Sequence, residues 1–330
     1  MPRLAVIFTG GTISMRSEPT GNGNAPALGA AALLQTVPGI ERIAEVEPVD
    51  WGLVPGSHLT FEQVLDIGRV IQRQIQRPDI DGVVVVQGTD NIEETAFAWD
   101  LLPLPAKPVV VVGAMRSASQ EGYDGPENLR NAIAAAAMPQ LADQGVVVAM
   151  AGTIHGADAV RKTHSHAYAT FQSVNAGHLG TVAEGQLMLA RRRRPAHLSA
   201  FPHRVPSVAL VTALLGANAP HIPVEAEGLI VEAMGGGNTQ AELLEAARQT
   251  MDRGATVVLT TRCPSGGVRP GYGFPGGSST WWEAGAVFSG WLDALKARVL
   301  LILALGAGLE RSEVIELFAS YGGGALRRAR

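Results

Sequence analysis

Two threonines follow short apolar runs, in positions where a hydroxyl could act as a nucleophile. Thr12 closes the sequence TGGT after the apolar residues 4–8, and Thr89 follows a run of valines at residues 83–86. Paired glycines let a backbone turn tightly and approach a ligand. A hydroxyl becomes nucleophilic when a neighbouring base takes its proton. Each turn therefore presents a candidate nucleophile, although a plain connecting turn would also explain the first tetrapeptide.

A carboxylate and a lysine complete the set of chemically useful groups. Asp90 precedes Glu93 by three residues at an expected helix start, and a capping box alone would explain that spacing. The helix dipole would equally favour an ionised carboxylate there. Lys162 is one of only three lysines, beside 23 arginines (26 minus 3). Most lysines are solvated, but a partly buried one can lose its proton and activate a hydroxyl.

Metal and nucleotide chemistry fit the sequence less well than catalysis by a hydroxyl and a lysine. His155, His164 and His166 lie near Lys162, but they lack the H-E-x-x-H spacing and have no thiolate beside them. There is no Walker A sequence, and residues 21–26 begin like G-x-G-x-x-G but end in proline. We therefore predict a site without metal or cofactor, and we disfavour an NAD-dependent enzyme.

The elements that must position these groups alternate along the chain. Short valine- and isoleucine-rich runs without polar interruption are typical of strands buried on both faces; they are residues 4–8, 83–86, 109–112, 146–150, 208–211, 229–231 and 257–259. Segments with helical period separate them, at residues 61–77, 91–102, 126–137, 239–253 and 310–320. This alternation predicts an α/β fold with a mostly parallel, helix-covered sheet. Such sheets bind ligands at the carboxyl ends of their strands.

Four consecutive arginines at residues 191–194, followed by three prolines within the next twelve residues, interrupt the pattern. We interpret this segment as a solvated linker rather than a nucleic-acid signal, because the net charge is −4. The predicted organisation is a larger N-terminal catalytic domain at 1–190, a linker at 191–207 and a smaller C-terminal α/β domain at 208–330.

Composition excludes several other classes of protein. The chain has 330 residues, of which 46% are hydrophobic and 17% charged, so it is not intrinsically disordered. The single cysteine excludes a disulfide framework, and an aromatic content of 5% disfavours single-strand binding. No apolar run is long enough for a signal peptide or a membrane span. We expect a cytoplasmic protein that binds neither nucleic acid nor membrane.

At these residues the chain resembles the bacterial L-asparaginases of the asparaginase/glutaminase family. The similarity spans nearly the whole chain and follows the family's order of motifs, at residues 9–13, 85–94, 112–116, 124–129, 162–173, 235–238 and 296–298. The resemblance implies conversion of L-asparagine to L-aspartate and ammonia, in asparagine catabolism, through a threonine acyl-enzyme. It also implies that small-molecule asparagine is the substrate and that no cofactor is used.

The resemblance also implies roles for individual residues. Thr12 would be the nucleophile. Thr89, Asp90 and Lys162 would form a hydrogen-bonded triad, with Lys162 as the base. Asp90 would also hold the substrate ammonium, and backbone N–H groups near Thr89 and Ala114 would stabilise the oxyanion. The implied substrate-binding positions are Ser57, His58, Gly88, Ala114 and Asn238.

Assembly is implied as well. Family members are homotetramers built from pairs, so we expect a homotetramer or homodimer in which Asn238 completes a neighbour's site. Glu283 lies near the family's borrowed glutamate, but its surroundings do not align cleanly with the family. Many relatives carry a tyrosine in the loop after the first motif, whereas residues 20–28 contain none.

Three alternatives stay open or are disfavoured. A dual glutaminase-asparaginase differs in substrate by one methylene, which a pocket distinguishes by only about 1–3 kcal/mol. The amide-hydrolysing subunit of a tRNA-dependent amidotransferase is disfavoured. Such subunits resemble asparaginases but carry an extra N-terminal domain, whereas this chain starts directly on its first strand. A non-catalytic binding module on the same fold would not need two threonines and a lysine together.

Overall fold

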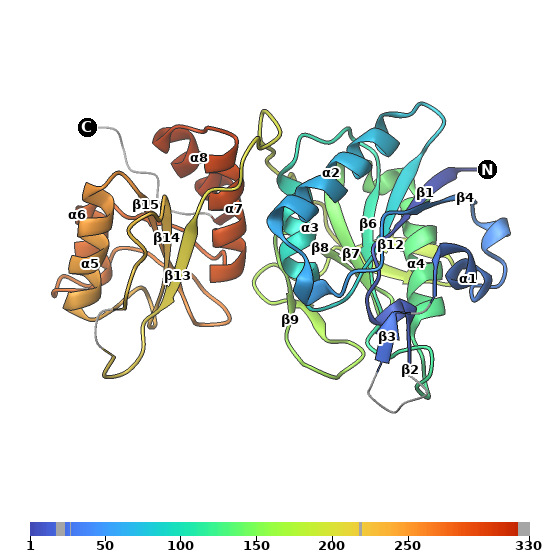
Figure 1. The fold of residues 1–330 in the computed structure, drawn as a ribbon, viewed down its shortest axis with the longest axis horizontal. Coiled ribbons are helices and arrows are strands. Elements are labelled where there is room, and N and C mark those ends of the chain that lie inside the picture. The colour runs from blue at the N-terminus through green and yellow to red at the C-terminus, as the bar shows by residue number, and fades with distance from the viewer. Residues whose placement is uncertain (18–23, 27, 218–219, 323–330) are drawn as a thin grey trace. The chain divides into compact units, whose positions relative to one another are not determined.

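The structure is a computed structural model that describes residues 1–17, 24–26, 28–217 and 220–322 (Figure 1). Its contacts divide the chain into two compact units, Met1–Pro195 and Ala196–Arg330. The tyrosine-free loop at 20–28 lies mostly outside the described residues. No helix in the described ranges is both long and apolar enough to cross a membrane.

An eight-stranded sheet forms the centre of the first unit, in the order β12-β11-β8-β7-β6-β5-β1-β4. Its parallel part comprises β4 (Glu45–Asp50), β1 (Arg3–Phe8), β5 (Gly82–Val86), β6 (Val109–Val112) and β7 (Val146–Met150). The antiparallel part comprises β8 (Thr153–Gly156), β11 (Gly180–Ala183) and β12 (Gln186–Leu189). Every residue of β5, β6 and β7 is buried, which explains their unbroken valine runs.

Helices cover this sheet, as Figure 1 shows for α2 (Phe61–Gln76), α3 (Ile92–Leu101) and α4 (Gly125–Ala136). The short α1 (Ala30–Gln35) contacts β4, and α4 contacts β5, β6 and β7. Two hairpins complete the unit: β2 (Met15–Ser17) pairs with β3 (Asn24–Pro26), and β9 (Val160–Lys162) pairs with β10 (Phe171–Ser173).

The second unit is a smaller α/β domain with an all-parallel sheet. Its strands are β13 (Val208–Thr212), β14 (Gly228–Ala233), β15 (Thr256–Thr261) and β16 (Val287–Phe288). Its helices are α5 (Ala241–Asp252), α6 (Ser278–Ala284), α7 (Ala294–Gly306) and α8 (Arg311–Gly322). The predicted fold class, a larger helix-covered sheet domain and a smaller α/β domain, is confirmed.

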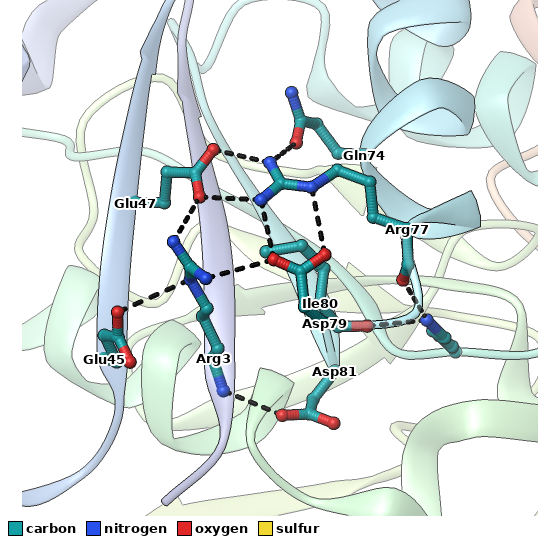
Figure 2. A network of polar contacts seen from close by, with 9 residues as sticks. Arg3, Glu45, Glu47, Gln74, Arg77, Asp79, Ile80 and Asp81 are labelled. Carbon is teal, nitrogen blue, oxygen red and sulfur yellow. Dashed lines mark hydrogen bonds and ion pairs between the residues drawn. The ribbon is translucent and has the colours of Figure 1, made fainter.

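The edge strand β4 is one element that the sequence did not predict, because its sequence EVEPVD is charged. Figure 2 shows the network of hydrogen bonds and ion pairs that the charged side chains of β4 form. Glu47 on β4 accepts hydrogen bonds from Arg3 on β1 (3.1 Å) and from Arg77 after α2 (2.5 Å). The Arg77 guanidinium lowers the pKa values of Glu47 and Asp79. Charged side chains on an edge strand also discourage pairing with another sheet.

The interpretation of residues 191–194 as part of a solvated linker is wrong for Arg193. Its side chain is only 5% exposed and pairs with the buried carboxylate of Asp100 on α3. It also lies 3.0 Å from an Asp158 carboxylate oxygen, and its Nε donates to the Gln144 carbonyl at 2.6 Å. A buried charge needs a partner, and Asp100 lies 93 residues earlier. No local pattern could have revealed that pair.

Candidate active site

Four loops leave the large sheet at one edge because the strands before them end in register. Phe8 pairs with Asp50 on one side and Val86 on the other, and Val86 pairs with Val112. The segments after these strands carry Thr12, Ser57, Thr89 and Ala114. The sheet register therefore gathers the predicted site loops at the carboxyl edge, where α/β sheets bind ligands.

Three of these loops approach one another closely, and each has a glycine at the point of contact. A Cβ atom added to Gly11 would lie 2.1 Å from the backbone nitrogen of Gly88. One added to Gly88 would lie 3.3 Å from the backbone nitrogen of Gly56. Gly11 also has a φ of 94°, a region that L side chains rarely adopt. These glycines allow the Thr12, Thr89 and Ser57 loops to touch backbone against backbone.

Lys162 contacts both neighbours that the family resemblance implies for it. Its Nζ donates to Thr89 Oγ1 at 3.0 Å and to Asp90 Oδ1 at 3.2 Å. The lysine side chain is 17% exposed and that of Asp90 is 67% exposed. Lys162 is therefore no solvated surface lysine. The contact crosses more than 70 residues of sequence and joins β9 to the loop before α3.

Asp90 does not cap α3. The N-cap residue is Asn91, without a side-chain capping bond, and its Nδ2 donates instead to the Gly56 carbonyl at 2.7 Å. The capping explanation of Asp90 is therefore wrong, and the carboxylate is available to Lys162. Glu93, noted in the sequence only as a capping partner, is buried and accepts from the Lys162 backbone N–H at 3.3 Å. It ties β9 to the first turn of α3.

Thr12 begins a short 3-10 helix, Thr12–Ser14, and is half-buried. The Ser14 hydroxyl donates back to the Gly11 carbonyl at 2.8 Å, which closes the turn on itself. With Gly11 against Gly88, this turn lies beside the loop that carries Thr89. The structure therefore brings the Thr12 turn to the triad loop.

The predicted substrate-binding residues of the first unit differ in exposure. Ser57 and His58 lie exposed on the 3-10 helix Gly56–His58. Ala114 is fully buried just beyond β6, in a loop held by Asp124. A Cβ added to Gly113 would lie 2.9 Å from the Thr89 methyl group. The exposed pair faces solvent, and the buried loop packs against Thr89.

Asn238 and Glu283 belong to the second unit. Asn238 exchanges backbone hydrogen bonds with Met234 across a three-glycine turn. Its Oδ1 is buried and accepts no hydrogen bond from the described residues. Glu283 lies exposed on α6. Of the two, only Asn238 carries a buried acceptor without a partner in the described chain.

The histidines near Lys162 form no metal-binding group in the part of the chain that the structure describes. His155 is buried with its Nδ1 2.9 Å from Ser173 Oγ, and burial lowers its pKa to about 4. His164 and His166 are exposed in the turn between β9 and β10. Across the described ranges, no three His, Cys, Asp or Glu side chains come together as metal ligands would.

Comparison with known proteins places both units in one family. Residues 3–195 match the N-terminal asparaginase domain, and residues 208–318 match the glutaminase/asparaginase C-terminal domain. A probable L-asparaginase of Deinococcus radiodurans is 34% identical over 332 residues, covering 96% of this chain and 97% of that protein. A probable periplasmic L-asparaginase of Haemophilus influenzae is 33% identical, with 97% and 93% covered.

A solved structure agrees with the sequence relatives. The crystal structure of a probable cytoplasmic L-asparaginase from Campylobacter jejuni has a TM-score of 0.87 and 28% identity. The similarity covers 97% of this chain and all of that one. The resemblance noted from the sequence motifs is thereby confirmed. With matching domain models over both units and full-length relatives above 30% identity, the chain belongs to the asparaginase family.

Proposed function

We propose that the protein hydrolyses L-asparagine to L-aspartate and ammonia through an acyl-enzyme on Thr12. The enzyme class, an amidohydrolase acting on a linear amide, follows from family membership. The observation that carries the proposal is the contact of Lys162 Nζ with Thr89 Oγ1 and Asp90 Oδ1, beside the Thr12 turn. A hydroxyl, an amine and a carboxylate in contact are what nucleophilic acyl transfer requires.

The reaction needs two acyl transfers. In the first, the Thr12 oxygen bonds to the side-chain amide carbon, the carbon–nitrogen bond breaks, and the threonine proton leaves with the nitrogen as ammonia. In the second, water attacks the resulting ester, one of its protons returns to Thr12, and aspartate is released. The sum consumes one asparagine and one water and forms one aspartate and one ammonia.

Lys162 and the neighbouring loops serve both steps. As an amine, Lys162 accepts a proton that the Thr89 hydroxyl relays, and as an ammonium it returns that proton. Backbone N–H groups of the Thr89 and Ala114 loops stabilise the oxyanion. Asp90 binds the substrate ammonium, while Ser57 and His58 border the α-carboxylate. This chemistry uses protein groups alone, so we propose that the enzyme needs no cofactor.

Ammonia release from L-asparagine, D-asparagine and L-glutamine, compared at equal enzyme concentration, tests the proposed substrate. We expect kcat/KM to be highest for L-asparagine. A pocket that separates substrates differing by one methylene supplies roughly 10–200-fold discrimination, so glutamine should be slower by a factor in that range. Equal rates for both amides would establish the dual glutaminase-asparaginase instead. No release from any of the three would refute amide hydrolysis at this site.

We further propose a homotetramer, or at least a homodimer, in which Asn238 of one subunit completes the site of another. The match of residues 208–318 to the glutaminase/asparaginase C-terminal domain supports this role, because the family resemblance implies that Asn238 lies at a neighbour's site. For location we propose the cytoplasm, as in the name of the Campylobacter relative. Cell fractionation decides this, since the Haemophilus relative is named periplasmic.

Shared sites predict complementation between inactive subunits. Thr12→Ala and Asn238→Ala should each lose most activity alone, and the two proteins refolded together should regain part of it. Restored sites would combine Thr12 of one chain with Asn238 of another. The matched control pairs Thr12→Ala with Lys162→Met, whose lesions lie in the same unit, and should restore nothing. Full activity of monomers at high dilution would show that each site is built within one chain.

A further inference from the structure

The segment between β6 and α4, residues 113–124, contacts the turn that carries Thr12. The Tyr123 hydroxyl donates to the Ile13 carbonyl at 2.5 Å, across 110 residues of sequence. In the same segment, the Ala118 N–H donates to the Met15 carbonyl at 3.1 Å. Residues 113–124 therefore hold the Thr12 turn at two points, the carbonyls of Ile13 and Met15.

The Tyr123 ring occupies a space that a glycine leaves open. A Cβ atom added to Gly125, the first residue of α4, would lie 2.4 Å from two ring carbons of Tyr123 and from its hydroxyl oxygen. Gly125 is buried and has no positive φ, so its backbone conformation does not require glycine. The missing side chain therefore allows the phenol to lie against the helix start.

The phenol remains a hydrogen-bond donor at every pH at which such an enzyme is assayed. Burial, reinforced by the Asp124 carboxylate and opposed by Arg16, raises the pKa of Tyr123 to about 12. A neutral phenol can donate to a carbonyl, which a phenolate cannot.

Asp124, the residue after Tyr123, holds the loop that carries Ala114. The Asp124 carboxylate accepts from the backbone N–H groups of Met115 (3.0 Å) and Arg116 (2.9 Å), and from Asn128 Nδ2 (2.9 Å). Asn128 in turn donates to the Gly113 carbonyl at 3.2 Å. Two adjacent side chains therefore hold different loops: Asp124 the one with Ala114, and Tyr123 the one with Thr12.

We propose that Tyr123 is a positioning residue, which fixes the Thr12 turn relative to the Ala114 loop through its bond to the Ile13 carbonyl. The inference rests on the proposed role of Thr12 as nucleophile. Tyr123 acts through the backbone and touches no reacting atom. Holding the attacking oxygen in place supplies much of the rate of acyl transfer, and a displacement of about 1 Å can cost up to about 100-fold.

Tyr123→Phe removes the hydroxyl and keeps the ring. We expect kcat to fall about tenfold or more with KM within about twofold, because the turn is misplaced but the binding groups remain. The pH profile should keep its shape. The matched control is Tyr168→Phe, whose hydroxyl donates to the Gly122 carbonyl of the same segment at 2.8 Å rather than to the Thr12 turn. It should retain full kcat.

Substitutions at Gly125 and Tyr123 test the contact between the Tyr123 hydroxyl and the Ile13 carbonyl in a second way, by displacing the ring. Gly125→Ala should displace the phenol and lower kcat as Tyr123→Phe does. In a Tyr123→Ala background, Gly125→Ala should cost nothing further, because no ring is left to displace. Independent losses from the two changes would contradict the proposal, as would an unchanged kcat or a shifted pH profile in Tyr123→Phe.

Hydrogen exchange separates this inference from the proposed function. Backbone amides of residues 12–15 should exchange faster in Tyr123→Phe than in wild type or Tyr168→Phe. If Thr12→Ala keeps its activity, the proposed nucleophile is wrong, while faster exchange would still establish the contact. Unchanged exchange in Tyr123→Phe would overturn the positioning role whatever the nucleophile is.

Discussion

Thr12→Ala should abolish turnover while leaving the fold and substrate binding in place. The side chain is half-buried and begins the turn that packs against the triad loop, and alanine fits that turn without strain. Losing a covalent nucleophile should reduce kcat by about 10⁴-fold or more, equivalent to about 5 kcal/mol of transition-state stabilisation. Steady-state ammonia release measures kcat, and calorimetric titration with L-asparagine measures binding.

Thr12→Ser is the conservative comparison, because it keeps a hydroxyl on the same atom. We expect it to retain measurable turnover, with a melting temperature close to that of Thr12→Ala. If Thr12→Ala keeps even a tenth of the wild-type kcat, another residue forms the acyl-enzyme. Loss of both activity and binding would instead indicate a collapsed loop, which the melting temperature would reveal.

Lys162→Met should be nearly as damaging, with an expected fall in kcat of about 10³-fold or more. Methionine approximates the length of the aliphatic stem but removes the amine that contacts Thr89 and Asp90. Thr89→Val should be similarly impaired. Because the two residues would act as one unit, the double variant should be little worse than either single variant.

Lys107→Met is a matched control for the lysine. Lys107 is also anchored, since its Nζ donates to the carbonyls of Arg77 and Ile80 at 2.7 and 2.6 Å, just after α2. Its loss should lower stability and leave kcat unchanged. Strict additivity of Lys162→Met and Thr89→Val would show that no joint proton relay exists.

The sequence predicted the interior of the fold better than its margins. The runs at 109–112 and 146–150 coincide with β6 and β7, because strands buried on both faces are apolar throughout. The strands β4, β8, β11 and β12 were missed, since the sheet's margins carry polar residues. Helix α7 was missed for the opposite reason. It is buried nearly all round, so its sequence has no polar face and no helical period.

The candidate site shows the same division between local and long-range information. Scarcity of lysine drew attention to Lys162, but Lys107 and the fully buried Lys296 are anchored as well, so scarcity alone does not identify function. The glycine turns were visible in the sequence, whereas their mutual contact was not. Tyr123 and Arg193 find partners 110 and 93 residues away, and nothing in their neighbourhoods signals either bond.

The backbone contact between Gly11, Gly88 and Gly56 has a consequence for how such an enzyme can diversify. Main-chain atoms hold the reacting loops together, so their spacing does not depend on the side chains around the rim of the site. Ser57 and His58 are exposed on the 3-10 helix Gly56–His58, at the rim that we propose for the site, and their exchange should leave the spacing undisturbed. New substrate preferences are therefore open to single substitutions there, while Gly11, whose added Cβ would lie 2.1 Å from the Gly88 backbone nitrogen, tolerates almost none. Because we propose that Ser57 and His58 border the α-carboxylate, laboratory selection for substrates altered at that group should accumulate its changes at 57 and 58 and leave Gly11 untouched.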